Sequence, residues 1–465
     1  MGLSPASVKE RVERDDIVRK IRRHGFAGPV FLVGGALREL ALGRTPHDYD
    51  FVLERAGDLA AFGQIFGSHG FLLGKKPIQT HRIVAGDVAV DITTIEGSIE
   101  EDLRRRDLTI NAVAYAFGDG TILDPLHGIG DMEERILRYP RREALREDPL
   151  RMVKTVRHLA VLRGFTLDPA LKNAIEADRG LINKTAAERL KYELDLIMAS
   201  HNPYKGIKAM VETRLLFEIF PDLLPLGEMD REKRLNPKAL GHTIEGFRHV
   251  NKVRRFHPLM EKEARHWGYA LLFHDLGKPL TYSCDEKNGR IHFYHHERHS
   301  RDIAARIMER LKFSVSETRA VLGLIESHMR IFLISNREAT EKATRRLVYK
   351  MEGLTPSLVF LTLLDLYGNT SGRENDSTLQ VRDRCREVLD AFEEFRCEPL
   401  PRILTGHDLL ALGFEPGPSL GHVLQDVREK QIAGEITEKE EALRYAETFL
   451  PRKNRGSKTG SREQA

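Results

Sequence analysis

Apolar residues along the chain first follow a helical spacing and then fall into short runs separated by turns. Within residues 1–26 the spacing predicts an N-terminal helix. Residues 81–94 and 109–115 hold short runs rich in β-branched residues, which predict strands or sheet edges with a helix between them. We therefore expect a small α/β head domain over residues 27–138. The apolar positions of the N-terminal helix are Val8, Val12, Ile17 and Ile21.

After the head, a helical spacing of apolar residues recurs in segments of the neck and of the tail. We expect residues 139–235 to form an all-helical neck, residues 236–395 a second large domain, and residues 396–451 a tail of two or three helices. Residues 452–465 are small, polar and basic, and we expect them to be disordered. The predicted fold class is therefore α+β, with a mixed head followed by all-α parts. The clearest apolar stripe in the neck is Leu150, Val153, Val156 and Leu159.

Composition narrows the class of protein only slightly. With 465 residues, of which 31% are charged and 41% hydrophobic, the chain is long enough for several domains with separate cores. No apolar run approaches the roughly 18 to 20 residues that span a bilayer, and there is no signal-peptide pattern, so we expect a cytoplasmic protein. Net charge is +4, and basic residues cluster at 104–106, at 135–163 and after Arg452, which would suit a polyanionic partner. The three cysteines are too few for a disulfide framework or a thiolate zinc site.

A glycine pair and a carboxylate pair lie close together in residues 31–51. Gly34 and Gly35 follow a short apolar run, and without a Cβ they allow backbone N–H groups to approach phosphate oxygens. Asp48 and Asp50 are two residues apart in an extended segment, so alternation along a strand aims both carboxylates at one face. That arrangement suits hard cations beside a polyphosphate, whereas two aspartates alone would describe a solvated turn.

A third acid, Asp91, interrupts a run of β-branched residues. A buried carboxylate without a partner would cost several kcal/mol. If its strand lies beside that of Asp48 and Asp50, Asp91 becomes a third carboxylate near the metals. The alternative is a solvent-facing aspartate on an edge strand.

Asp148 and Arg151 are spaced i, i+3 near the start of the predicted neck helix, which would place them side by side. Together they offer an acceptor and donors that could meet the Watson–Crick edge of cytosine or adenine. The alternative is an intrahelical salt bridge worth a few tenths of a kcal/mol. Spacing alone favours the salt bridge.

These motifs resemble those of a known family. The sequences G-G-A-L-R-E, L-G-R and D-Y-D, then R-R-D-L-T-I-N-A and E-D-P-L-R, are similar to the motifs of class II tRNA nucleotidyltransferases and bacterial poly(A) polymerases, within the superfamily of DNA polymerase β. Glu39 stands where the family has aspartate, and Lys154 where it usually has arginine. The resemblance implies a polymerase-β-like head with a mixed sheet, two Mg²⁺ ions, CTP and ATP as substrates, and tRNA as partner.

The resemblance also implies roles for single residues of this chain. It implies that Asp48, Asp50 and Asp91 are catalytic and that the first two bind Mg²⁺. It implies that Arg105 and Arg106 neutralise phosphate, that Asp107 bonds a ribose hydroxyl, and that Asn111 holds its loop through bonds to the backbone. Asp148 and Arg151 would be the amino-acid template for the incoming base. The implied nucleotide-binding residues are Gly34, Gly35, Arg38, Arg105, Arg106, Asp107, Asn111, Asp148, Arg151, Lys154 and Arg157.

Histidines become frequent between residues 236 and 330, and adjacent His274 and Asp275 resemble the HD phosphohydrolase domain. Imidazole with carboxylate is a ligand set for a divalent transition metal. His295, His296 and His299 compete for one ligand position, and His296 followed by glutamate fits the family best. The implied ligands are His242, His274, Asp275, His296, His328 and Asp365.

The expected activity is attack of a tRNA 3′-hydroxyl on the α-phosphate of CTP or ATP, with release of pyrophosphate. A different class of reading is an HD phosphohydrolase whose head only binds nucleotide, and a third is a non-catalytic RNA-binding protein. Only 14 residues separate Asp91 from Arg106, and Glu96 follows the paired threonines where the family usually has a basic residue. Full CCA-adding relatives usually carry a longer loop here, so the resemblance favours addition of two cytidines. Full CCA addition, A-addition and poly(A) synthesis stay open.

Overall fold

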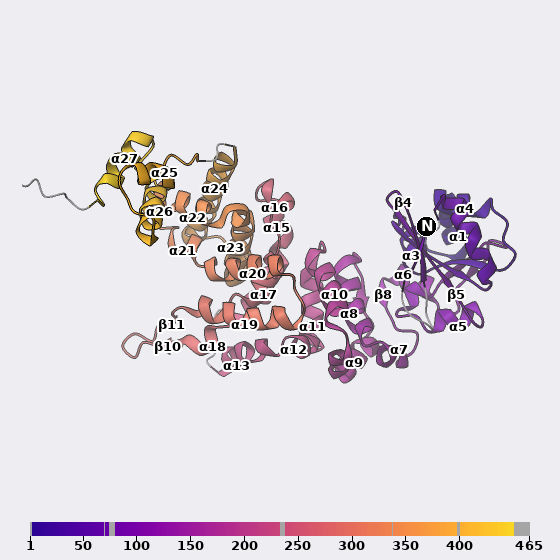
Figure 1. The fold of residues 1–465 in the computed structure, drawn as a ribbon. Helices are drawn as coiled ribbons and strands as arrows, with labels where there is room; N and C mark the ends of the chain where they lie inside the picture. Colours follow the sequence, from indigo (N-terminus) through magenta and orange to yellow (C-terminus); the bar gives the residue numbers. More distant parts are fainter. Residues whose placement is uncertain are drawn as a thin grey trace, which may run out of the picture. The chain divides into compact units, whose positions relative to one another are not determined.

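The computed structural model describes residues 2–68, 70–73, 80–232, 238–336, 338–397 and 400–450. The predicted disordered segment 452–465 lies outside them. The chain divides into two compact units, and the boundary between them follows the predicted neck (Figure 1). The first unit is Met1–Glu232 with Arg306–Phe313, and the second is Lys233–Ala305 with Ser314–Ala465.

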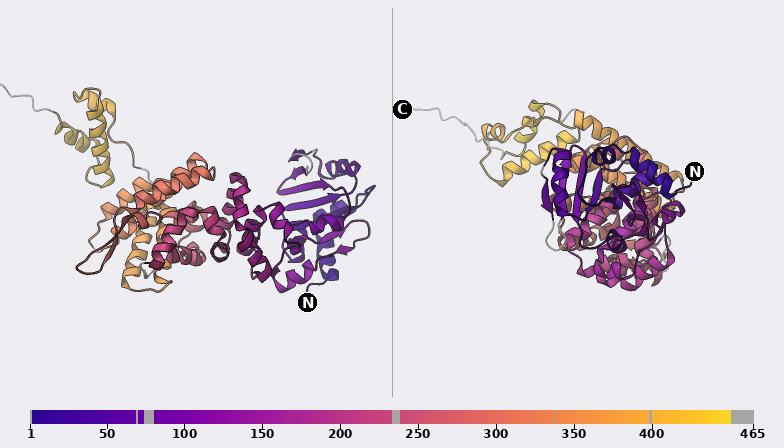
Figure 2. Two further views of the ribbon diagram at one scale, coloured as in Figure 1. Left: turned by 90° about the horizontal axis from the view of Figure 1, so that it is seen from below. Right: turned by 90° about the vertical axis from the view of Figure 1, so that its right-hand side faces the viewer.

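The head is built on one mixed sheet. Among the described residues seven strands lie in the order β3-β4-β5-β2-β1-β6-β7. Several strands of this sheet can be seen side by side in the left view of Figure 2. Within this sheet β2 and β5 pair in parallel, and the other neighbours pair antiparallel. The mixed sheet of the predicted α+β fold is thereby confirmed. The strands are β1 Val30–Val33, β2 Asp48–Leu53, β3 Phe71–Leu73, β4 Thr80–Ala85, β5 Val88–Thr94, β6 Ala114–Ala116 and β7 Ile122–Leu123.

Two helices, rather than the predicted single one, precede the sheet. Asp15 has an extended backbone and accepts a hydrogen bond from the N–H of Val18, so it ends one helix and caps the next. This break shifts the helical phase, and Val18 rather than Ile17 is buried. The helices of the head are α1 Pro5–Arg14, α2 Asp16–Arg22, α3 Gly34–Ala41, α4 Leu59–Phe66, α5 Ile99–Arg104 and α6 Gly128–Glu134.

The described part of the neck is helical apart from β9 Thr166–Leu167, which pairs in parallel with β8 Ile136–Leu137 at the end of the head. The predicted apolar stripe lies on α8, and each of its four residues is buried. Helices α10 and α11 pack against α8, so the helix that carries the candidate template is enclosed by its own domain. The neck helices are α7 Glu143–Glu147, α8 Leu150–Val161, α9 Pro169–Asp178, α10 Ala187–Ala199, α11 Pro203–Glu212, α12 Leu215–Ile219 and α13 Leu224–Glu232.

Where the structure describes the second unit, it is helical except for one hairpin, β10 Tyr282–Cys284 with β11 Ile291–Phe293. Its core surrounds α23, which packs against α14, α17 and α24. The helices of this region are α14 Ala239–Gly246, α15 Val250–Arg254, α16 Leu259–Lys262, α17 Trp267–Phe273, α18 Lys278–Thr281, α19 His296–Arg310, α20 Val315–Ser327, α21 Arg330–Leu333, α22 Glu341–Met351, α23 Thr355–Thr370 and α24 Asp376–Cys397.

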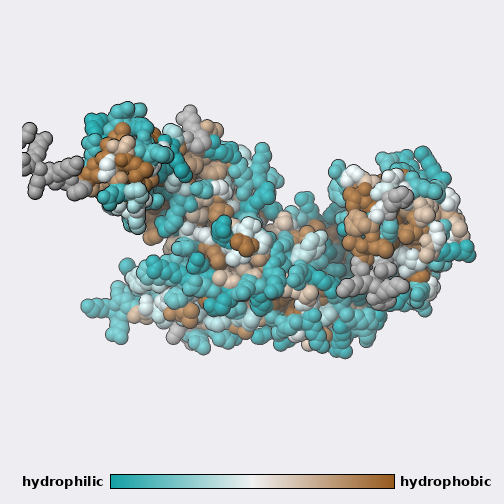
Figure 3. All heavy atoms as spheres, viewed as in Figure 1, coloured by the Kyte–Doolittle hydropathy of each residue, from teal (hydrophilic) through white to brown (hydrophobic). Residues whose placement is uncertain are grey.

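The described part of the tail holds three helices with a small core of their own, α25 Gly406–Ala411, α26 Pro418–Ile432 and α27 Lys439–Glu447. Figure 3 shows apolar side chains reaching the surface over these helices. One stretch, Glu341–Thr370, is long and apolar enough to cross a membrane, but 72% of its apolar window is buried inside the protein. Such burial is typical of a core helix.

Candidate active site and metal centre

The three head aspartates meet on one face of the sheet. Asp48 and Asp50 lie on β2, and the parallel register places Asp50 directly opposite Asp91 of β5. Strand β5 is flanked by β4 and β2, so the alternative reading of Asp91 as a residue on an edge strand is wrong. Burial raises the pKa of Asp50, Arg106 opposes this rise, and the charges of Asp91 and Asp48 add to it. These carboxylates carry like charges on one face, and a bound cation would reduce the repulsion among them.

The glycine pair lies against this carboxylate face. Gly34 has a φ of +72°, and a Cβ there would lie 2.8 Å from Oδ2 of Asp50 and 3.0 Å from Nη1 of Arg106. The backbone N–H of Gly35 faces Asp50 and lowers the pKa of its carboxyl. Only glycine at position 34 lets a carboxylate and a guanidinium approach the start of α3 so closely. The predicted approach of these glycines to phosphate stays a prediction.

Arg82 is a residue of this face that the sequence analysis missed. Its Nε donates to Oδ1 of Asp91 at 2.7 Å, and its Nη2 donates to Oδ2, so the pair is bidentate. The sequence does contain a signal for this pair. Gly86 and Asp87 form a two-residue turn that sets Ala85 opposite Val88, and the same strand register sets position 82 opposite position 91. Asp91 therefore has its partner within the sheet, whereas Asp48 makes no hydrogen bond or ion pair with any described residue.

The two predicted phosphate-binding arginines differ in how they are held. Arg106 is anchored by Asp102, which accepts from its Nε at 3.1 Å and its Nη2 at 2.9 Å, and this leaves Nη1 beside Gly34. Arg105 is exposed and donates through Nε to the carbonyl of Glu101 at 3.3 Å. Arg106 is thus the fixed cation over the carboxylates, and Arg105 is a cation free to meet a ligand from solvent.

Arg38, by contrast, lies inside the protein. Its guanidinium is 9% exposed and donates to Glu39 at 2.9 Å, to Oδ1 of Asn111, and to Nε2 of His158, which lies 3.1 Å away. Burial lowers its pKa, and Glu39 opposes that shift. The glutamate that replaces the aspartate of the family motif is therefore the counter-ion of this arginine. A direct contact of Arg38 with nucleotide stays a prediction.

The expectation that Asn111 binds backbone groups is wrong in its detail. Its amide accepts from Arg38 and donates to Oδ1 of Asp107 at 2.9 Å, so both bonds go to side chains. The reason is its place in the buried 3₁₀ helix Thr109–Asn111, which packs against α3. Burial raises the pKa of Asp107, but the hydrogen bond from the Asn111 amide, the charge of Lys154 and the N–H of Leu108 outweigh burial, so this pKa is lowered. Asp107 is therefore a fixed anion at neutral pH.

The template pair is not the side-by-side helical pair that the spacing predicts. Asp148 precedes proline and has an extended backbone, with φ −134° and ψ 93°, because proline disfavours the helical region for the residue before it. Asp148 accepts from Arg189 at 3.0 Å, and Arg151 donates to the carbonyl of Ala144 at 3.2 Å. The alternative, an ion pair between Asp148 and Arg151, does not form among the described residues. Arg189 therefore supports the template through its bond to Asp148.

Two further predicted nucleotide contacts lie along α8. Arg157 donates to the buried carboxylate of Glu193 on α10 at 2.7 Å, which pins its guanidinium between the helices. Lys154 is half-buried, and its charge helps to lower the pKa of Asp107. Lys154 is therefore positioned toward the head, and Arg157 joins α8 to α10 within the neck.

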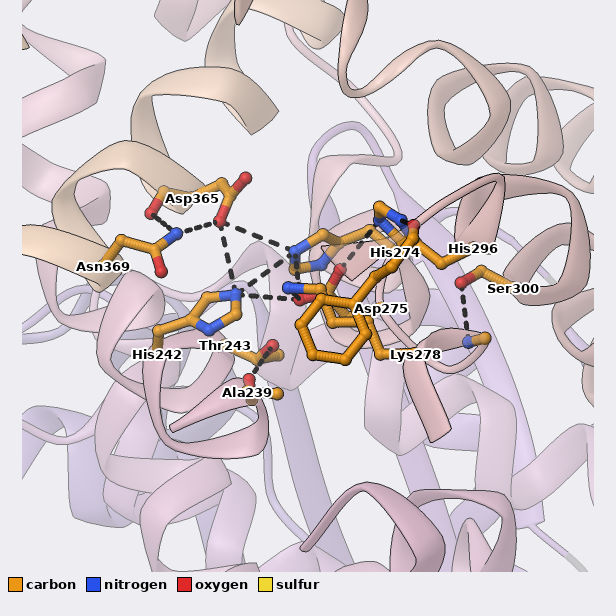
Figure 4. A network of polar contacts seen from close by, with 12 residues as sticks. Ala239, His242, Thr243, His274, Asp275, Lys278, His296, Ser300, Asp365 and Asn369 are labelled. Carbon is orange, nitrogen blue, oxygen red and sulfur yellow. Dashed lines mark hydrogen bonds and ion pairs between the residues drawn. The ribbon is translucent and has the colours of Figure 1, made fainter. Parts of the chain in front are cut away.

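The second cluster of chemistry is buried in the second unit, and Figure 4 shows its side chains converging. All six predicted ligands are buried. Each of the four histidines has Nδ1 within 2.7 to 3.0 Å of a backbone carbonyl of its own segment. A carbonyl only accepts, so Nδ1 carries a proton, and Nε2 is the nitrogen that points into the cluster. This orientation is the usual one for histidines that bind metal.

Asp275 stands at the centre of the cluster and points its two oxygens at different partners. Oδ2 lies 3.0 Å from Nε2 of His242 and 3.3 Å from Nε2 of His274. Oδ1 lies 3.3 Å from Nε2 of His296, which is 3.1 Å from Nε2 of His328. Oδ1 is buried and makes no hydrogen bond in the described structure, and such an orphan acceptor suits a cation. The donor set therefore fits a divalent metal.

The geometry separates the three competing histidines. His296 is 6% exposed and faces Asp275, whereas His295 and His299 are exposed. A Cβ on Gly277 would lie 2.2 Å from the carbonyl oxygen of His296, so this glycine lets the segment after His274 and Asp275 reach the start of α19. The predicted choice of His296 as ligand agrees with this arrangement.

Two residues that the sequence analysis did not name complete the cluster. Lys278 donates to Oδ2 of Asp275 at 2.6 Å, and Asn369 donates to Oδ1 of Asp365 at 2.7 Å. Burial raises the pKa of Asp365, but His274 and His242 hold it well below its usual range. The two ligand groups whose atoms all lie within 4.8 Å are His242, His274 and Asp365, and His274, Asp275 and His328. Among the described residues no head group meets that criterion.

The fold and the two clusters define a nucleotidyltransferase head joined to an HD domain. Family models agree: residues 75–138 match the "Poly A polymerase head domain", residues 164–226 the "Probable RNA and SrmB- binding site of polymerase A", and residues 239–370 the "HD domain". Curated relatives match nearly the whole chain. The A-adding tRNA nucleotidyltransferase of Deinococcus radiodurans is 30% identical over 90% of this chain and 95% of its own length.

The CC-adding tRNA nucleotidyltransferase of Thermus thermophilus is 33% identical over 89% of this chain and 92% of its own length. Among solved structures, the Thermotoga maritima CCA-adding enzyme complexed with tRNA has a TM-score of 0.62 at 19% identity, covering 95% of this chain and 97% of that one. That likeness supports the fold. The chain belongs to the family of tRNA nucleotidyltransferases and bacterial poly(A) polymerases. It is therefore an enzyme, and the reading as a non-catalytic RNA-binding protein is excluded.

Proposed function

We propose that this enzyme adds nucleotides from CTP or ATP to the 3′ end of tRNA in the cytoplasm. The observation that carries the proposal is the in-register placement of Asp50 beside Asp91, with Asp48 on the same face and its carboxylate unpaired among the described residues. Asp48 and Asp50 would hold two Mg²⁺ ions, which supply charge stabilisation for attack of a 3′-hydroxyl on an α-phosphate and for departure of pyrophosphate.

The remaining roles belong to residues placed around that face. Arg106, anchored by Asp102, binds the charge of the triphosphate, and Arg105 adds a second cation from solvent. Asp148 accepts the exocyclic N–H of a base while Arg151 donates to its ring acceptors. Because Asp148 is already oriented by Arg189, and Arg151 by Ala144, the template needs little rearrangement before it reads a base.

We further propose that the enzyme stops after two cytidines. Strand β5 ends at Thr94 and α5 begins at Ile99, so only four residues join them. Ser98 caps α5 by accepting from the N–H of Glu101, which fixes this short connection. No room is left for a loop that could help the template exchange cytosine for adenine. Relatives with both CC-adding and A-adding names make the A-adding reaction the main competitor.

The test uses two tRNA transcripts with CTP and ATP together, followed by sizing of the products. A transcript that ends at the discriminator base should gain two cytidines and no adenosine, and one that already ends in CC should not be extended. Adenosine added to the CC transcript alone would identify an A-adding enzyme. A complete CCA end or a long adenosine tail would refute the loop argument, and no extension of either transcript would refute transfer itself.

The buried cluster supports a second activity. We propose that the HD domain binds a divalent transition metal and hydrolyses phosphate esters, because four histidines present Nε2 toward two carboxylates. Metal analysis of the purified protein and assay of bis(p-nitrophenyl) phosphate before and after chelation test this. Hydrolysis that chelation does not reduce would exclude the HD cluster as its source.

A further inference from the structure

His158 is a buried titratable residue to which neither the sequence analysis nor the proposed reaction assigns a role. It lies on α8, seven positions after Arg151, and its side chain is 3% exposed. Nδ1 lies 2.7 Å from the carbonyl oxygen of Lys154, and Nε2 lies 3.1 Å from Nη1 of Arg38. A buried histidine beside a buried arginine has to be explained, because two cations there would repel each other.

The partners fix the tautomer of this imidazole. The carbonyl of Lys154 can only accept, so Nδ1 carries the hydrogen, and the guanidinium of Arg38 can only donate, so Nε2 must be a lone pair. The ring is therefore neutral. Burial, Arg157 and Arg38 hold the pKa of His158 well below its usual range, and Asp107 opposes them without reversing the shift. His158 is an obligatory acceptor for Arg38.

This hydrogen bond joins two elements that carry different parts of the proposed site. Arg38 lies on α3, one turn after Gly34 and Gly35, whose backbone faces the carboxylate of Asp50. His158 lies on α8, the helix that contains Arg151 and begins two residues after Asp148. The two residues are 120 positions apart in the chain, and both are buried. The contact therefore sets the distance between the carboxylate face and the template helix.

We propose that His158 is a positioning residue, whose hydrogen bond from Arg38 aligns the template helix so that the base read by Asp148 belongs to the nucleotide whose α-phosphate lies at Asp48 and Asp50. This inference rests on the proposed transferase function. A loose alignment would harm the choice of base more than the stability of the protein. Misplacement by about 1 Å is enough to cost roughly a hundredfold in a positioned reaction.

The experiment compares two variants and a matched control by steady-state kinetics with CTP and with UTP. Uracil carries an acceptor where cytosine carries the N4–H₂ donor that Asp148 would read, so UTP reports on alignment. H158F removes the acceptor for Arg38, and H158Q keeps an acceptor near the position of Nε2. The control is T155V, which removes a buried hydroxyl that donates only to the backbone carbonyl of Arg151 on the same helix and does not contact Arg38.

For H158F we expect the preference for CTP over UTP in kcat/KM to fall by about tenfold, with a higher KM for CTP. H158Q should recover most of that preference, and T155V should keep the wild-type value. Equal loss with both nucleotides in H158F, or the same loss in T155V, would overturn the proposal. If H158F does not fold, H158N takes its place, because its acceptor lies nearer the position of Nδ1 and cannot reach Arg38.

The wild-type enzyme separates failure of this inference from failure of the proposed function. If the wild type adds no nucleotide to tRNA, the transferase proposal fails. If the wild type is active and H158F prefers CTP over UTP as strongly as the wild type does, only the alignment proposal fails.

Discussion

The two acidic clusters of this protein arrange their candidate cation ligands in opposite ways. In the head, Asp48 is exposed and Asp50 and Asp91 are half-buried on a strand face, and the register of two parallel strands places them. In the HD domain, the ligands are buried, and each histidine is fixed by a carbonyl of its own segment. The head cluster is an open surface, whereas the HD cluster is enclosed and its imidazoles are already oriented by the backbone.

Substitution of the head carboxylates is the strongest test of this comparison. Asp48→Ala or Asp50→Ala should lower nucleotide addition by more than about a thousandfold, since a metal ligand supplies several kcal/mol of charge stabilisation. The fold should persist, because neither side chain belongs to the apolar core. Incorporation of labelled CTP into tRNA measures the loss, and Asp87→Asn, in an exposed turn of the same sheet, is the control. Near wild-type addition by either variant would remove these residues from the site.

The HD cluster offers the reciprocal test. His274→Ala combined with Asp275→Ala should abolish metal-dependent phosphodiesterase or phosphatase activity and leave nucleotide addition within about twofold of wild type, because the two clusters lie in separate units. Both activities are measured on one preparation, with thermal unfolding as a check of the fold. Hydrolysis that survives the double change has another source, and loss of both activities would mean that the sites are coupled.

A smaller effect separates neighbouring histidines. His296→Ala should weaken metal binding by about 10- to 100-fold, since it removes a group that faces Asp275. His295→Ala should not change it, because that side chain is 69% exposed. Metal content after dialysis against a graded chelator gives the affinity. Equal retention of metal by both variants would exclude His296 as a ligand.

The smallest expected effect concerns Gly34, and the chain supplies its own control. Gly34 and Gly43 have nearly equal φ values of +72° and +74°, but a Cβ on Gly43 meets nothing within 4 Å. Both Gly→Ala variants should lose about 1 kcal/mol of unfolding free energy from the left-handed backbone. Only Gly34→Ala should also lose activity, by about tenfold, because its methyl group displaces Asp50. Equal activity of the two variants would show that the close approach does not matter.

Much of the fold could be predicted because its signals are local. The stripe on α8 repeats within a few residues, and the alternation that aims Asp48 and Asp50 at one face needs only two. The order of histidines in the HD domain is likewise written along the chain. The extended backbone of Asp148 could also be predicted from the proline after it, although the i, i+3 spacing indicated a helix instead.

Contacts between distant elements could not be predicted, because periodicity says which face of an element is buried but not what covers it. The sequence shows Arg38 within a nucleotide-binding motif, and only the packing of α3 on the neck reveals that it is buried against His158, 120 residues away. The choice among His295, His296 and His299 was likewise decided by which side chain turns inward at the start of α19. The sequence by itself determined the chemistry available at each site, and the tertiary structure decided which groups meet, because side-chain contacts depend on how whole elements pack.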